Sequence, residues 1–247
     1  MKAFKTMLKT EMKLSLRGMD MVIFAVGFPV VVSVILGIIY GNSPAYEGAD
    51  YSFLAQSFGA VVSIGISAAG LMGLPLVLSD YRHKKILKRF KVTPVSPAKL
   101  LFVQVIVNLI YSVLSLAAVY LVSISFFGIE LRGSVVYFTA AYLLVVISIY
   151  SLGMLVAAVS PNIKISNVLC TLLYFPMLIF SGATLPYEVM PKTMQTVADF
   201  LPLTQGIKLL KGAALGLQLD NILIPIIVMS GFTVICMGLS VRFFKWE

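Results

Sequence analysis

Few residues of this sequence have the types and spacing that chemistry at an active site requires. His83 is the only histidine, and the two cysteines, Cys170 and Cys236, both lie inside long apolar runs. No group of His, Cys, Asp or Glu residues has the spacing of a metal site. The sequence also lacks a G-x-x-x-x-G-K-[ST] loop to hold the phosphates of ATP. We therefore expect no catalysis and no cofactor in this chain, and energised transport would have to draw on a partner protein.

The densest charge in the chain lies between residues 80 and 99, where seven residues are Lys or Arg. We expect Asp80 to cap a short basic helix that ends near Lys91, because Pro94 then interrupts the helical pattern. Such a cluster can simply orient the neighbouring membrane helices. However, Leu87 and Phe90 also give it an apolar side, and a docking site for a cytoplasmic partner fits that combination.

A second unusual segment covers residues 181–206. It is too apolar for a free extracellular loop, yet Pro186, Pro191 and Pro202 divide it into short pieces. Backbone that does not cross the bilayer is tolerated at membrane depth only where it is buried in protein or lines a cavity. We therefore predict a pair of short re-entrant or interfacial helices that cap the outer end of the protein.

The elements that must position these two segments are membrane-spanning helices. Of the 247 residues, 60% are apolar and only 12% are charged, which is too apolar a balance for a soluble domain of this size. A helix needs roughly 20 apolar residues to cross the hydrocarbon core of a bilayer, and six runs are predicted to do so. The six predicted spans are Met21–Tyr40, Phe53–Ser79, Leu100–Phe127, Val135–Val159, Ile165–Phe180 and Asn221–Val241.

The charges predict how these spans are oriented. None of the six runs contains Asp, Glu, Lys, Arg or His, so we expect no proton relay within the membrane. A net charge of +9 would suggest a nucleic-acid partner in a soluble protein, but here the charges cluster beside apolar runs. Of the 19 Lys and Arg residues, 15 flank alternate ends of the spans. The positive-inside rule then places both termini in the cytoplasm, and we expect no nucleic acid as a partner.

Two further patterns concern packing. Residues 1–18 carry basic residues on one helical stripe and apolar residues on the opposite one, which predicts an amphipathic helix on the cytoplasmic surface of the membrane. The second span is rich in small residues, and such residues let helix backbones approach closely in lipid. The small residues predicted to pack against neighbouring helices include Gly59, Ser63, Gly65, Ala69 and Gly73.

The basic segment resembles a motif of the type-2 ABC export permeases. Leu87 to Ser96 follows the pattern L-K-R-x-x-x-T-P-[VL]-S of the drug- and antibiotic-export branch. The apolar segment from Phe180 to Thr204 resembles the motif that precedes the last helix of this family. The order, spacing and six-span layout match over nearly the whole chain. The sequence departs from the family at Lys85, where a glycine is usual, and at Tyr81, where an acidic residue is frequent.

The resemblance implies an assembly and a mechanism. Two such subunits would pair, as a homodimer or heterodimer, and two separate ATPase subunits that bind ATP and Mg²⁺ would dock beneath them. Amphipathic cargo such as a drug, antibiotic, peptide or lipid would move outward across the cell membrane of a bacterium or archaeon. The residues expected to couple to the ATPase are Arg82, Lys84, Lys85, Leu87, Lys88, Arg89, Phe90, Thr93 and Pro94. The residues expected to form an outer gate are Gly182, Leu185, Pro186, Pro191, Pro202, Leu203 and Thr204.

The sequence therefore predicts an all-α membrane protein with one transmembrane domain over residues 1–247. It comprises the interfacial helix (1–18), spans one to five (21–180), the outer helices (181–206) and span six (221–241). Two other functions fit six apolar spans. One is a substrate-capture subunit of a small-molecule importer, against which the basic and outer segments argue. The other is a non-transporting membrane anchor or sensor that holds a cytoplasmic partner.

Overall fold

A computed structural model gives the structure of the protein and describes residues 2–41, 43–46, 48–87, 97–184, 187, 190–217 and 222–244. Regular structure within these residues is helical, apart from an isolated bridge between Pro44 and Ser52. Six helical segments are long and apolar enough to cross a membrane. The prediction of an all-α, six-span membrane protein is therefore confirmed.

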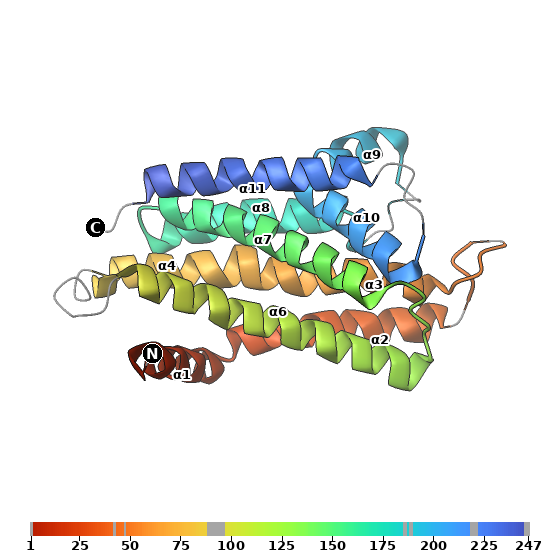
Figure 1. Cartoon of the computed structure of the whole chain (residues 1–247), viewed down its shortest axis with the longest axis horizontal. Coiled ribbons are helices and arrows are strands. Elements are labelled where there is room, and N and C mark those ends of the chain that lie inside the picture. The colour runs from red at the N-terminus through yellow and green to blue at the C-terminus, as the bar shows by residue number, and fades with distance from the viewer. Residues whose placement is uncertain are drawn as a thin grey trace.

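The six spans run antiparallel to their neighbours in the chain and form an elongated bundle (Figure 1). In chain order they are η1 (Val22–Gly27) with α2 (Phe28–Tyr40), then α3 (Phe53–Ser67) with η2 (Ala68–Gly73) and α4 (Leu74–His83), then α6 (Pro97–Phe127), α7 (Val135–Val159), α8 (Ile163–Phe180) and α11 (Leu223–Phe243). Among the described residues, three further helices lie at the ends of the bundle: α1 (Lys2–Gly18), α9 (Lys192–Asp199) and α10 (Pro202–Leu215).

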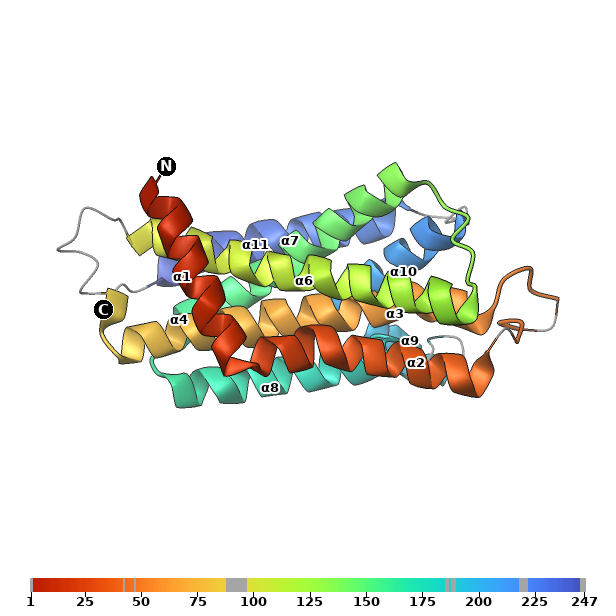
Figure 2. The ribbon, with the colours of Figure 1, turned by 90° about the horizontal axis from the view of Figure 1, so that it is seen from below.

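The two ends of the bundle differ in character. The helix α1, the turn after α4 and the end of α11 share one end, which we call the basic end (Figure 1). The helices α9 and α10 lie at the other end, which we call the capped end. At the basic end α1 crosses the bundle at a steep angle and contacts α6 (Figure 2). Phe4, Met7, Leu8 and Met12 pack against the core, so the predicted amphipathic helix is present, although Leu14 is exposed.

The second span is the centre of the bundle. It contacts α2, α6, α7, α8 and α10, and nearly all of its side chains between Leu54 and Leu74 are buried. Its glycines lie where a larger residue would collide with a neighbour. A Cβ atom added to Gly59 would lie 2.9 Å from the backbone nitrogen of Lys211, and one added to Gly65 would lie 2.9 Å from the carbonyl oxygen of Ala25. Close backbone approach of this kind is how helices associate in lipid.

The remaining small residues of the second span are also enclosed. A Cβ atom at Gly73 would lie 2.5 Å from the sulfur of Met21, and both Ser63 and Ala69 are fully buried. The hydroxyl of Ser63 donates to the carbonyl oxygen of Gly59 within the helix. The five small residues singled out in the sequence therefore all lie inside the bundle, on more than one side of the second span.

Two prolines are accommodated by wide helical turns. Pro29 and Pro75 occupy the first turns of α2 and α4, directly after the π-helical turns η1 and η2. A proline inside a helix cannot donate to the carbonyl four residues earlier, and its ring crowds that carbonyl. A π turn widens the backbone at that point. The first two spans therefore continue through their prolines, whereas Pro176 lies inside α8 without such a turn.

Two predicted boundaries are wrong. Asp80 does not cap a separate helix, because α4 continues through it to His83, and the Asp80 carboxylate instead pairs with Lys84 one turn later at 2.7 Å. The second outer helix does not end near residue 206. It continues to Leu215, where Gly216 ends it with a φ of +68°. Left-handed backbone at a glycine is a common way to terminate a helix.

Candidate functional site at the two ends of the bundle

Arg82 lies in the last turn of α4 and is directed into the bundle at the basic end, with only 9% of its surface exposed. Its Nη1 donates to the carbonyl oxygens of Ala157 at 3.0 Å and Ser160 at 2.5 Å. The carbonyl of Ala157 lacks its usual helical donor, since residue 161 is a proline without an N–H group. The guanidinium carbon also lies 5.1 Å from the ring centre of Phe244. Arg82 therefore ties the base of the second span to the end of α7.

The chain turns sharply after α4. Lys84 and Lys85 are both exposed, and Lys85 has a φ of +56°. This left-handed conformation favours glycine, which is the residue usual at this position in the permeases that the segment resembles. Leu87 is 1% exposed, so its side chain packs inward again. The described part of the predicted coupling segment thus presents two lysines outward and holds Arg82 and Leu87 against the bundle.

Several predicted site residues lie outside the described residues. They are Lys88, Arg89, Phe90, Thr93 and Pro94 of the basic segment, and Leu185 and Pro186 of the outer one. Their predicted roles in ATPase coupling and in an outer gate stay predictions.

A hydrogen-bonded group at the basic end was not predicted from the sequence. The carboxylate of Glu11, on α1, accepts from the hydroxyl of Tyr81 on α4 and from Nε2 of Gln104 on α6, the latter at 2.7 Å. It therefore links three helices that are distant in sequence. One pattern could have indicated it: Glu11 is an acidic residue on the helical face that also carries Met7 and Leu8, where an unpaired charge would be costly.

The described residues of the predicted outer gate lie around the start of α9 and α10. Gly182 follows α8 with a φ of +91°, Pro191 precedes α9, and Pro202 is the first residue of α10. Leu203 and Thr204 are essentially inaccessible to solvent, whereas Pro191 is exposed. The capped end thus brings Gly182, Pro202, Leu203 and Thr204 into the protein interior. Whether they open and close a path stays a prediction.

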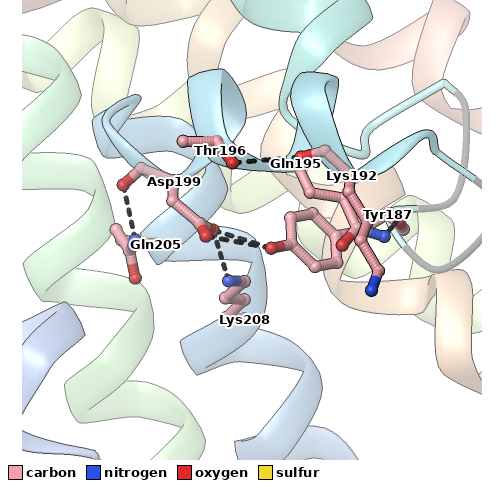
Figure 3. A network of polar contacts seen from close by, with 7 residues as sticks. All are labelled: Tyr187, Lys192, Gln195, Thr196, Asp199, Gln205 and Lys208. Atoms are coloured by element: carbon pink, nitrogen blue, oxygen red, sulfur yellow. Dashed lines mark hydrogen bonds and ion pairs between the residues drawn. The ribbon is translucent and has the colours of Figure 1, made fainter.

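A polar network fixes the two short helices of the capped end to each other (Figure 3). Asp199 accepts from Nζ of Lys208 at 2.6 Å and from the hydroxyl of Tyr187 at 2.9 Å. Gln205 donates to the backbone carbonyl of Asp199 at 2.7 Å, and Gln195 donates to that of Tyr187 at 3.0 Å. Burial and the hydrogen bond to Asp199 raise the pKa of Tyr187, so its hydroxyl stays protonated and donates. This network was not predicted from the sequence, although charged residues in so apolar a segment could have indicated it.

The chemistry available at the two ends is that of binding and mechanical linkage. Within the described residues, no three His, Cys, Asp or Glu side chains gather closely enough to hold a metal ion. Both described cysteines, Cys170 and Cys236, are buried and free. At each end, however, polar side chains join helices that are far apart in the sequence. This arrangement suits a protein in which movement at one element is passed on to others.

Comparison with known proteins gives one family and two partial relatives. The family model described as ABC-2 type transporter matches residues 2–215, from the start of α1 to the end of α10. A Nodulation protein J of Rhizobium leguminosarum bv. viciae is 36% identical over 85 residues, which are 34% of this chain and 33% of that protein. A Nodulation protein J of Rhizobium leguminosarum bv. trifolii is 41% identical over 66 residues, which are 27% of this chain and 25% of that protein. The matched segments thus span a third or less of either relative.

Proposed function

Because the chain belongs to the ABC-2 type transporter family, we propose that it is the permease subunit of an ATP-driven exporter that moves amphipathic cargo. A separate ABC ATPase would bind ATP and Mg²⁺ and dock at the basic end. A second permease subunit, identical or related, would complete the path through the membrane. The observation that carries this proposal is the family match, which covers both the basic turn and the two capping helices.

The geometry of the basic end supports the docking assignment. The turn after α4 exposes two lysines, and Arg82 joins the same turn to the end of α7. Glu11 joins α4 to α1 and α6. A partner that pushed on this turn would therefore move four helices together. The positive-inside rule places this end in the cytoplasm, where an ATPase has access to ATP.

Two observations bear on the cargo. The basic motif resembles that of the drug- and antibiotic-export branch, whereas the two partial relatives are nodulation proteins. We propose amphipathic cargo as the class, delivered outward across a bacterial or archaeal cell membrane. The Asp, Glu, Lys, Arg and His residues of the six spans all lie at the ends of helices at the basic end, which is consistent with energy supplied by a partner; they are Asp80, Arg82, His83, Lys99, Lys164 and Arg242.

Copurification from native membranes tests the proposal. The tagged full-length chain, extracted in a mild detergent or in nanodiscs, should bring down an ABC ATPase, and removal of the chain should change the turnover of that ATPase. If no ATPase associates under either condition, the proposal fails. A membrane anchor would retain its partner without any dependence of turnover on cargo, and a substrate-capture subunit would bind a small ligand without any ATPase.

A further inference from the structure

A cavity of about 350 Å³ opens at the capped end, between α2, α3, α10 and the segment that follows α8. This volume falls in the lower part of the range of small-molecule sites. Tyr40 and Phe53 form part of its wall, and their rings lie 4.2 Å apart. Tyr40 is the last residue of α2 and Phe53 the first of α3, so the cavity lies at the depth where a span meets the membrane surface.

Three side chains that line the cavity have polar atoms without a hydrogen-bond partner. They are Oε1 of Gln56, Oγ of Ser181 and Oγ1 of Thr204. Gln56 is 9% exposed and the other two residues are 1% exposed. A buried polar atom without a partner costs about 1–3 kcal/mol. Three such atoms around one cavity therefore indicate that something else hydrogen-bonds there.

The types of these groups restrict what the ligand can be. Oε1 of Gln56 only accepts, so the ligand must donate, whereas the hydroxyls of Ser181 and Thr204 donate or accept. Lys208 and Lys211 also line the cavity, and none of its described lining residues is acidic. Lys208 pairs with Asp199, which does not line the cavity, so the charged residues of the described lining are cationic and favour an anion over a cation. The ligand should thus carry hydroxyl groups and a negative charge.

The rest of the wall is apolar and includes Leu36, Ala60 and Ile207. A free polar ion would leave this surface without a partner, whereas an acyl chain would cover it. We propose that the cavity binds a lipid with a hydroxylated, anionic headgroup from the membrane leaflet at the capped end. The proposal does not depend on ATP-driven transport, since it concerns binding to the permease chain alone.

Native mass spectrometry of the full-length chain in an amine-oxide detergent tests this proposal, because that detergent carries neither hydroxyls nor net charge. The probes are palmitoyl-oleoyl phosphatidylglycerol, phosphatidylcholine with the same chains, and glycerol phosphate as the headgroup alone. We expect phosphatidylglycerol to bind about tenfold more tightly than phosphatidylcholine, and glycerol phosphate not to displace it. Equal binding of the two lipids, or displacement by glycerol phosphate, would overturn the proposal.

Substitutions of lining residues test whether the lipid binds in this cavity. Gln56→Leu combined with Thr204→Val removes two of the unpartnered groups at nearly constant volume and should weaken phosphatidylglycerol binding by about tenfold or more. Lys211→Gln should weaken it several-fold, whereas Lys192→Gln should not, since Lys192 is exposed on α9 and does not line the cavity. Variants whose unfolding temperature matches that of the native chain but whose binding is unchanged would contradict the assignment.

Discussion

Replacing Arg82 by glutamine should loosen the basic end and uncouple it from the rest of the bundle. Arg82 donates two hydrogen bonds from a charged group to carbonyl oxygens at the end of α7. Each hydrogen bond from a charged group contributes about 1.5–3 kcal/mol to the free energy of unfolding. Part of this loss is recovered, because Nε and Nη2 of Arg82 are buried without partners and are removed by the same substitution. We therefore expect a net destabilisation of about 2 kcal/mol.

The matched control is Lys84→Gln, which removes the same charge at the same end. The side chain of Lys84 is 61% exposed and its ion pair with Asp80 joins residues one helical turn apart. Exposed pairs of this type contribute only about 0.3–0.5 kcal/mol. The two variants thus separate the loss of a charge from the loss of a buried linkage.

The assay uses the two buried cysteines, Cys170 and Cys236, which become reactive only when the bundle opens. Heating in detergent with a maleimide that fluoresces on reaction with thiols gives the unfolding temperature. At about 2–4 °C per kcal/mol for a chain of this size, Arg82→Gln should lower that temperature by about 4–8 °C and Lys84→Gln by less than about 2 °C. Equal shifts for the two variants would refute the role assigned to Arg82.

Three further predictions concern the packing of the second span, the turn after α4 and the capped end. Gly65→Ala should lower the free energy of unfolding by about 1–3 kcal/mol, because the added Cβ would collide with α6 and η1. Its control is Gly238→Ala, which should leave the stability unchanged or raise it slightly, because no atom lies within 4 Å of the added Cβ. The thiol assay described above compares the two variants. Lys85→Gly should raise the unfolding temperature by about 2–4 °C, because it relieves a left-handed backbone, and a decrease would count against that strain. Asp199→Asn should speed amide hydrogen exchange in α9 and leave exchange in α1 unchanged; equal effects at both ends would contradict a local network.

The membrane-spanning architecture was predictable because lipid imposes it on the sequence. A span needs about 20 apolar residues, and both ends of each span must return to water. Boundaries were less certain, since an Asp such as Asp80 can either cap a helix or pair with a lysine one turn later. The structure shows that Lys84 is that partner. Local sequence alone allowed both outcomes.

The site could be predicted only in part, because its contacts are long-range. Glu11 and Tyr81 are 70 residues apart, and Arg82 and Ser160 are 78 apart. Periodicity along one helix cannot show which other helix lies opposite. Arg82 was expected to couple to the ATPase, and the sequence did not predict that it donates to the carbonyl of Ala157, which Pro161 leaves without a helical donor. Pro161, two residues beyond the end of α7, was the available indication that such a carbonyl needed a partner.

The most direct test of the account measures ATP hydrolysis by the copurified complex in nanodiscs after reversal of charge in the basic segment. Lys88→Glu with Arg89→Glu should abolish the dependence of hydrolysis on cargo while leaving the unfolding temperature unchanged. Arg132→Glu with Lys192→Glu reverses two exposed charges away from the basic end and should leave hydrolysis as in the native complex. Unaltered coupling in the first variant, or equal loss in both, would contradict the claim that energy enters at the basic end.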